Sequence, residues 1–375
     1  MLAFSRILNN QQKGKDLGVE SLRGLAILLV VAFHIIGHSP SSGIQVSEDS
    51  FWRYFTDTLE FIRLPLFVAI SGFVYALKPV NKSEGTGFLL GKARRILIPF
   101  LMVSTLQYVA NTYAPATNNE LLIANIWRIY LFPWAQFWYL QAIALVFMLI
   151  FLLEQTSILK SFTSWLGTLA ITFTLLMIFD RNHYSGIFSI WGALYIFPFF
   201  ILGLGIQRFQ DILFRKSVLR VAGFIMIVGF LLQQLDWFRI LDTGLERKSL
   251  ITLVTSLSGI VVLFRFRRNI PILSRLGYYS YSIYLFHVFG GAGSRIILQW
   301  IGIENKGILF AGAMLMAILV AVIIERIVLP YSWPRFLILG MRLHKSAPES
   351  SVSSPFRRDK PLYPESVQPK RSKSA

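Results

Sequence analysis

The chain has 375 residues, of which 54% are hydrophobic, and its formal net charge at pH 7 is +18. A soluble protein of this length would not need so much apolar surface, so we expect a membrane protein. The chain contains no cysteine, which excludes disulfides, thiolate catalysis and cysteine-ligated metal sites.

Apolar runs of roughly 17 to 25 residues, the length that crosses a bilayer as a helix, recur along the sequence and predict about ten spans. We therefore expect an all-α integral membrane protein, a polytopic bundle over residues 1–338. Over 339–375, Ser, Pro, Lys and Arg dominate, and we expect a basic, disordered cytoplasmic tail. The predicted spans lie near 22–38, 60–77, 96–113, 137–153, 163–179, 189–206, 219–235, 250–264, 276–293 and 307–329.

The positive charge is distributed unevenly between the two sides of this predicted topology. With the N-terminus inside, the cytoplasmic segments carry 26 Lys and Arg residues and the opposite loops carry 8. This is the direction of the positive-inside rule, so both termini are predicted to be cytoplasmic. The net charge is thus a topology signal, and nucleic acid is not expected as a partner. The first apolar run follows a polar stretch without an obvious cleavage site, so it is interpreted as a retained span.

The first span pairs an arginine with a histidine. It reads S-L-R-G-L-A-I-L-L-V-V-A-F-H-I-I from residue 21 to residue 36. In a helix, Arg23 and His34 share a face to within about 20° and are separated by a rise of roughly 16 Å. If Arg23 lies at one membrane surface, His34 lies near the midplane, where an imidazole is costly and usually has a reason.

The second span opens with two charged residues and contains a small-residue pair. Glu60 and Arg63 are three residues apart and can pair on one helical face. A snorkelling interfacial pair without a further role is the alternative. Ser71 and Gly72, inside the span, would allow close helix approach or a local bend.

A cationic cluster precedes the third span, where the sequence reads G-K-A-R-R-I-L-I-P. Lys92, Arg94 and Arg95 can be topology determinants, as such clusters commonly are. They can also clamp phosphate groups, a role that guanidinium and ammonium groups suit.

The ninth span carries a polar face. Ser280, Tyr284 and His287 follow the spacing i, i+4, i+7 and lie on one side of a helix. Hydrogen-bonded contacts between helices and the wall of a pocket are both open interpretations. No Walker loop, zinc motif or nucleophile elbow is present, so no metal site is expected.

Together these landmarks resemble the membrane-bound acyltransferase family 3, over most of residues 16 to 335. The L-P-L-F form of the second span is similar to the family's stand-alone sugar O-acetylases, which lack a fused hydrolase domain. Lys92 stands where the family's R-x-x-R cluster has its first arginine, and an ammonium group does not bind phosphate in the bidentate way of a guanidinium. The five matching elements are the R-x10-H pair Arg23 and His34; Phe67, Ser71, Gly72 and Phe73; Lys92 and Arg95; Trp138, Tyr139 and Leu140; and the G-x-x-S-Y-x-x-Y-L-x-H residues Gly277, Ser280, Tyr281, Tyr284, Leu285 and His287.

The resemblance implies transfer of an acyl group, usually acetyl from cytoplasmic acetyl-CoA, to a hydroxyl of a lipid-linked or exported glycan. O-antigen, exopolysaccharide and peptidoglycan are typical acceptors. Acyl-CoA is then a co-substrate and no bound cofactor is expected. The other partners would be membrane lipid and the glycan, and the location would be the bacterial inner membrane.

The resemblance also suggests roles for individual residues. His34 would be the general base, since an imidazole titrates near neutral pH, and Arg23 would face the arriving donor. Donor binding would fall to Lys92, Arg94, Arg95, Phe67, Ser71 and Gly72. A pocket would draw on Trp138, Tyr139, Ser280, Tyr281, Tyr284, His287, Glu60 and Arg63.

Direct transfer is one mechanism, and a covalent acyl relay through a histidine, Tyr281 or Tyr284 is another. Two other functions also suit about ten spans with a histidine inside the membrane. A polytopic transporter or flippase would move its substrate unmodified, and a glycan polymerase of the envelope would lengthen it. The absence of two inverted halves argues against the transporter, and the modest outer loops argue against the polymerase.

Overall fold

The computed structural model describes residues 16–80, 84–114, 121–179, 185–241 and 249–343. Within these ranges every regular element is an α-helix or a 3-10 helix, and there is no strand. The predicted all-α fold class is therefore confirmed.

In the described residues, ten long helices lie where the apolar runs predict them. Most of their ends agree to within a few residues, because polar or helix-breaking residues end a helix as they end a hydrophobic segment. The third helix, however, begins at Gly85, eleven residues before the predicted span, and the ninth ends at Trp300, seven residues after it. The ten helices are α2 (Leu17–Ile36), α4 (Glu60–Leu77), α5 (Gly85–Tyr113), α7 (Trp138–Gln155), α8 (Phe162–Ile178), α9 (Ile190–Arg208), α11 (Lys216–Trp237), α12 (Leu250–Arg265), α14 (Ser280–Trp300) and α15 (Lys306–Val328).

Short helices connect the long ones in the described segments, and most of them have no counterpart in the apolar pattern. They are too short and too polar to register as hydrophobic runs. They are α3 (Phe51–Thr58), α6 (Arg128–Leu131), α10 (Gln210–Leu213), α13 (Pro271–Tyr278) and α16 (Ser332–Leu339), with the 3-10 turns η2 (Ile123–Asn125), η3 (Ala135–Phe137), η4 (Ile158–Lys160) and η5 (Ile187–Ser189).

Six helical stretches of the described chain are long and apolar enough to cross a membrane. They are α2, α4, the stretch that ends in α7, the stretch that ends in α9, α11 and α15, while α8 and α12 are apolar but shorter. Burial divides these six into two groups. In α2 and α9, 67% and 72% of the apolar window is buried, against 11% in α11 and 22% in α15. The apolar faces of α11 and α15 thus point outward, as helices in contact with lipid do.

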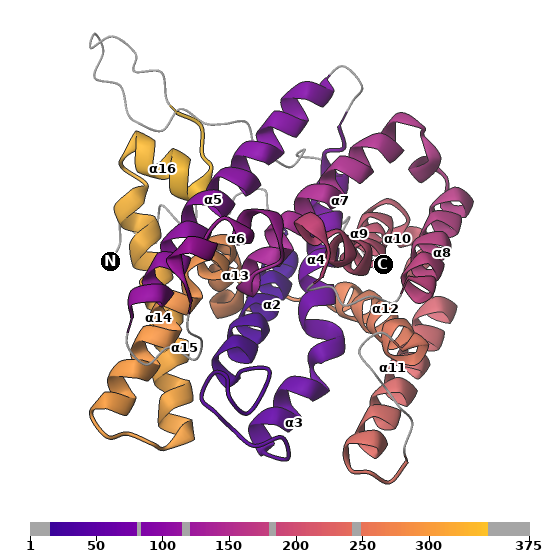
Figure 1. The fold of residues 1–375 in the computed structure, drawn as a ribbon. Coiled ribbons are helices and arrows are strands. Elements are labelled where there is room, and N and C mark those ends of the chain that lie inside the picture. Colours follow the sequence, from indigo (N-terminus) through magenta and orange to yellow (C-terminus); the bar gives the residue numbers. More distant parts are fainter. Residues whose placement is uncertain (1–15, 81–83, 115–120, 180–184, 242–248, 344–375) are drawn as a thin grey trace, which may run out of the picture.

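The helices α2 and α4 run through the middle of the bundle (Figure 1). They contact each other, and α4 also packs along α9. The pair α14 and α15 lies on one side with α5 and α16, and α8, α11 and α12 lie on the other side. The two helices that carry the predicted motifs of the first and second spans are therefore at the centre.

Two helix crossings bring backbones together at glycines. Where α2 crosses α13, a Cβ atom on Gly24 would lie 1.9 Å from the carbonyl oxygen of Leu273, and one on Gly277 would lie 2.0 Å from that of Glu20. Where α4 crosses α9, a Cβ atom on Gly72 would lie 2.0 Å from the carbonyl oxygen of Phe200. No side chain fits at these positions, which is the close packing that small residues allow between membrane helices.

The start of α2 lies earlier than the apolar run suggests. Asp16 caps the helix, and its Oδ1 accepts hydrogen bonds from the backbone N–H groups of Gly18 and Val19 at 2.9 and 3.2 Å. A polar N-cap of this kind lets a helix begin before its hydrophobic segment. Arg23 is consequently inside α2, and His34 lies two residues before its end at Ile36. Relative to the helix, His34 is near one end and not in the middle.

The beginning of the predicted tail packs on the bundle. α16 contacts α5, and Gly340, at φ +62°, ends α16 against the backbone of Arg94 and Arg95. The remainder of the predicted tail, 344–375, lies outside the described residues.

Candidate active site

A cavity of about 350 Å³ lies where the ends of α2 and α5 meet the middle of α14. Its lining holds two histidines, His34 and His287, together with several amide side chains and one arginine. The polar lining residues are His34, Gln107, Asn111, Gln136, His287 and Arg295.

The two histidines come from opposite ends of the sequence and face each other. The ring centroids of His34, on α2, and His287, on α14, are 5.1 Å apart, and the rings are inclined by 43°. Nδ1 of His287 lies 3.0 Å from the carbonyl oxygen of Ile283 and 2.9 Å from that of Tyr284. A carbonyl only accepts, so Nδ1 carries the proton and Nε2 keeps its lone pair. This buried Nε2 has no hydrogen-bond partner in the described part of the chain.

Aromatic residues of three helices pack beside the histidine pair. The ring centroids of Tyr284 and Tyr139 are 5.5 Å apart, and Phe67 lies 5.8 Å from Tyr139 and 6.4 Å from Tyr284. The hydroxyl of Tyr284 donates a hydrogen bond to the carbonyl oxygen of Gln136, a cavity residue. The predicted residues of the second, fourth and ninth spans therefore meet in one place.

Arg23 makes an ion pair that the sequence analysis overlooked. Its Nη1 donates to both carboxylate oxygens of Glu20, at 2.8 and 2.9 Å, and Glu20 is buried. The i, i+3 spacing is the signal that would have predicted this pair. Arg23 does not line the cavity, and the rise along α2 separates it from His34 by roughly 16 Å.

The predicted pairing of Glu60 with Arg63 is confirmed, at 4.0 Å. Arg63 is only 5% exposed, so its guanidinium lies inside the protein and does not snorkel. Its Cζ sits 3.7 Å from the ring centroid of Phe33, the residue before His34, and its charge reaches the His34 ring. This pair therefore flanks the histidine end of α2.

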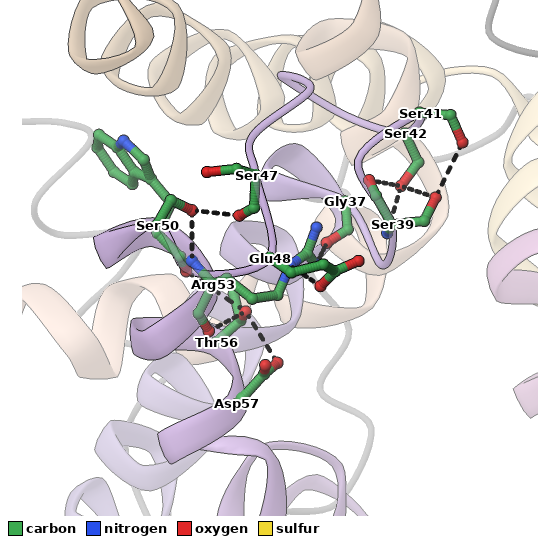
Figure 2. A network of polar contacts seen from close by, with 11 residues as sticks. Gly37, Ser39, Ser41, Ser42, Ser47, Glu48, Ser50, Arg53, Thr56 and Asp57 are labelled. Atoms are coloured by element: carbon green, nitrogen blue, oxygen red, sulfur yellow. Dashed lines mark hydrogen bonds and ion pairs between the residues drawn. The ribbon is translucent and has the colours of Figure 1, made fainter. Parts of the chain in front are cut away.

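The loop after α2 folds back on the end of that helix (Figure 2). The buried Arg53, on α3, donates from Nη1 to the carbonyl oxygen of Gly37, and its Nε lies 3.3 Å from Glu48. The backbone N–H of Ile44 donates to the carbonyl oxygen of Ile35 at 2.9 Å. These contacts hold the turn of α2 that carries His34.

The basic cluster of α5 lies far from the cavity. Nζ of Lys92 lies over the ring of Phe147 at 3.5 Å, so this lysine points toward α7, and burial lowers its pKa to about 7. The backbone carbonyl of Arg95 accepts a hydrogen bond from the hydroxyl of Tyr281 at 2.5 Å. The charge of Arg342, beyond α16, reaches Arg94. Arg342 is a cation that sequence reasoning missed, because only the fold brings it to α5.

Four predicted residues have a structural role at their positions. Gly72 lies at the α4–α9 crossing, where packing alone requires a glycine, and the Ser71 hydroxyl donates to the carbonyl oxygen of Phe67 at 3.2 Å. Trp138 is buried at the start of α7. Ser280 is also buried and is not part of the cavity lining, which α14 supplies from His287 onward.

Comparison with known proteins identifies the family of this chain. Residues 16–326 match the family model described as an acyltransferase domain. The chain belongs to the acyltransferase 3 family. No curated protein and no solved structure gives a match. The family match contains both histidines and the α5 cluster, whereas α16 and Arg342 lie beyond it.

Family membership decides between the classes of function left open by the sequence. With several long apolar helices, this member of the acyltransferase 3 family is a multi-pass membrane protein. Its activity in general terms is acyl transfer.

Proposed function

We propose that this protein transfers an acyl group, in the first instance acetyl, from acyl-CoA to a hydroxyl of a lipid-linked or exported glycan at the bacterial inner membrane. The observation that carries the proposal is the pair His34 and His287, 5.1 Å apart, in a cavity lined by amide side chains. Amides suit the recognition of sugar hydroxyls because each one both donates and accepts hydrogen bonds.

The proposed chemistry is direct transfer with His34 as general base. The imidazole of His34 takes the proton of the acceptor hydroxyl while the hydroxyl oxygen attacks the thioester carbonyl. The C–S bond then breaks, and the sulfur of coenzyme A leaves with a proton returned from His34. His287 acts as a positioning residue: its fixed Nε2 accepts a hydrogen bond from the acceptor, while the backbone carbonyls hold its ring.

The donor would enter at the α5 cluster. Lys92, Arg94, Arg95 and Arg342 gather there, and within the described residues none of the four makes an ion pair. Such a set of cations suits the phosphates of coenzyme A. Arg95 and Asn111 both belong to α5, and sixteen residues of helix separate them by roughly 24 Å. A long donor that extends along α5 would bring its thioester to the histidines.

The proposed topology has about ten spans with both termini and the basic tail in the cytoplasm. The positions of the ten long helices support it. Because the native chain has no cysteine, single cysteines can map it without background. A cysteine at Glu48 should react with a membrane-impermeant maleimide in intact cells, and one at Lys216 should react only after permeabilisation. The reverse pattern would overturn the topology.

The experiment for the function uses purified protein in nanodiscs with radiolabelled acetyl-CoA and the glycan fraction of the source membrane. Wild type should label the glycan, and His34→Ala should lower the rate of labelling by about 100-fold or more. His287→Gln, which keeps an acceptor near the position of Nε2, should retain more affinity than His287→Asn, and the loss should appear in KM. Full labelling by a correctly inserted His34→Ala would refute the mechanism. Labelled protein that survives denaturation would establish a covalent relay instead of direct transfer.

A further inference from the structure

Helix α16 brings two arginines to the basic cluster of α5. This helix packs beside α5 (Figure 1) and carries Arg335, and Arg342 follows just beyond its end at Leu339. Both arginines lie after residue 326, where the match to the family model ends. The family domain therefore does not supply these two cations, which come from the segment that follows it.

Contacts connect these two arginines to Arg94 on α5. The backbone at Gly340, with φ +62°, packs so closely that a Cβ atom there would collide with the carbonyl oxygen of Arg94. The charge of Arg342 reaches Arg94, and Nη2 of Arg335 donates to the carbonyl oxygen of Arg342 at 3.5 Å. The turn at Gly340 thus holds the two arginines of the C-terminal segment against α5.

The three arginines carry donor groups that the described part of the chain does not satisfy. Nη1 of Arg94 and Nε of Arg335 are buried, and neither has a hydrogen-bond partner among the described residues. Nor does any ion pair between described residues involve Arg94, Arg335 or Arg342. Buried N–H groups without an acceptor and neighbouring like charges are both unfavourable. A bound anion would relieve both.

These arginines and Lys92 lie on different sides of α5. Lys92 and Arg94 are two residues apart, which corresponds to about 200° around a helix. Nζ of Lys92 lies over the ring of Phe147 on α7, whereas Arg94 is reached by the charge of Arg342 beyond α16. The α5 cluster therefore offers two places for anionic groups, one toward α7 and one toward α16.

We propose that Arg94, Arg335 and Arg342 form a subsite for a phosphate group, and that α16 completes it. This inference rests on the proposed function, whose donor carries a diphosphate and, on its ribose, a 3′-phosphate monoester. A phosphate monoester has a charge of about −1.5 to −2 at pH 7 and three acceptor oxygens, which suits three guanidinium groups. The subsite then binds the 3′-phosphate, and Lys92 is left for the diphosphate.

An anionic lipid at the membrane surface offers the same phosphate chemistry, so the first experiment separates the two sources without catalysis. Purified protein in nanodiscs of phosphatidylcholine, which has no net charge, is titrated with coenzyme A and with dephospho-coenzyme A, which lacks only the 3′-phosphate. Coenzyme A should bind about 10- to 100-fold more tightly, the range that hydrogen bonds between charged groups provide. If a lipid is the ligand instead, adding phosphatidylglycerol should raise the thermal midpoint, and the two nucleotides should bind equally.

Variants connect the response to α16. Arg335→Gln and Arg342→Gln should each remove most of the preference for coenzyme A and leave the affinity for dephospho-coenzyme A unchanged. Arg335→Lys should keep part of the preference, because it keeps the charge but not the guanidinium. Arg215→Gln, which changes an exposed arginine before α11, should behave as wild type. Because Arg342 is exposed, Arg342→Gln should fold, and it carries the test if Arg335→Gln does not.

The outcomes separate this inference from the alternatives. A response to phosphatidylglycerol that Arg335→Gln or Arg342→Gln removes would keep the subsite and make a lipid phosphate its ligand. Equal binding of the two nucleotides without such a response would overturn the inference, as would a preference for coenzyme A that both variants retain in full.

Failure of the subsite and failure of the proposed function give different results. If wild type does not acylate the glycan while the preference for coenzyme A and its dependence on α16 persist, the proposed function fails and the subsite stands. If acylation proceeds with the same KM for the acetyl derivatives of both nucleotides, and phosphatidylglycerol has no effect, the function stands and the subsite fails.

Discussion

The crossing of α2 and α13 gives the sharpest test of how the active site is held. In Gly277→Ala, the new methyl group would lie 2.0 Å from the carbonyl oxygen of Glu20. Real Cβ atoms keep at least 3.0 Å from such neighbours, so α13 and α2 must separate by about 1 Å. Backbone cannot rotate away as a side chain would, and overpacking of this kind costs typically 1–3 kcal/mol.

The displaced segment carries Glu20 and its partner Arg23, and α2 continues from there to His34. Misplacing a reacting group by about 1 Å can lower a rate about 100-fold. We therefore expect Gly277→Ala to lower both the thermal midpoint and the acyl-transfer rate. Gly24→Ala, whose methyl would lie 1.9 Å from the carbonyl oxygen of Leu273, should do the same from the other side of the crossing.

The matched control is Gly223→Ala on α11, where a Cβ atom meets nothing within 4 Å. Alanine favours a helix over glycine by about 1 kcal/mol, so this variant should be as stable as wild type or more stable. Scanning fluorimetry of the purified variants measures the midpoints, and transfer of labelled acetyl measures the rates. If Gly277→Ala and Gly24→Ala match Gly223→Ala in both, the crossing does not position the site.

Three further predictions concern charged groups. Glu20→Gln should lose about 1.5–3 kcal/mol of stability, because it removes the charged partner of Arg23; chemical denaturation of the two proteins checks this. Burial and the neighbouring Glu60 raise the pKa of Asp57 to about 6, so the folded state binds this proton more tightly than the unfolded chain. The thermal midpoint of wild type should therefore fall relative to that of Asp57→Asn as the pH rises from about 4 to about 6, and the difference should stay constant above pH 6. A difference in midpoint that is the same at all pH values would contradict this. Lys92→Met should raise the KM for acyl-CoA about 10-fold at pH 6, because it removes a cation that binds phosphate. This increase should fade above pH 7, where Lys92 of the wild type loses its proton. Arg95→Met should also raise the KM, and its effect should persist above pH 7 because arginine stays charged.

The positions of the long helices followed from the sequence because hydrophobic length is a local property. The edges were harder to predict. Asp16 extends α2 beyond its apolar run through a side-chain cap, so the helix begins at Leu17 and not near residue 22. The short α13 was not predicted as a separate helix, although the motif glycine Gly277 lies in it.

The candidate site was predictable residue by residue but not as an arrangement. The i, i+4, i+7 pattern placed His287 on a polar face of its helix. No local pattern predicts that this face contacts His34, more than 250 positions earlier in the chain. That contact depends on helix crossings. Gly24 and Gly277 allow such a crossing, but a glycine in the sequence does not predict which helix will pack against it. Arg295 and Arg342 were missed for the same reason: each is an ordinary basic residue until the fold places it beside the cavity or the α5 cluster.

The place of His34 at the end of α2 changes what catalysis requires. A base at the middle of a span would be reached about equally from both sides. Here the histidines share their cavity with the far end of α5, roughly 24 Å along that helix from the cationic cluster. Under the proposed function, the acceptor therefore reaches the histidines over a short distance, whereas the donor must extend from the cationic cluster along α5. Binding energy from the donor phosphates is needed to hold the thioester at that distance, which is how remote groups assist a reaction.

A truncated donor that keeps the thioester but lacks the diphosphate, such as acetyl-pantetheine, should therefore lose kcat as well as affinity. With such a donor, Arg95→Met should differ little from wild type.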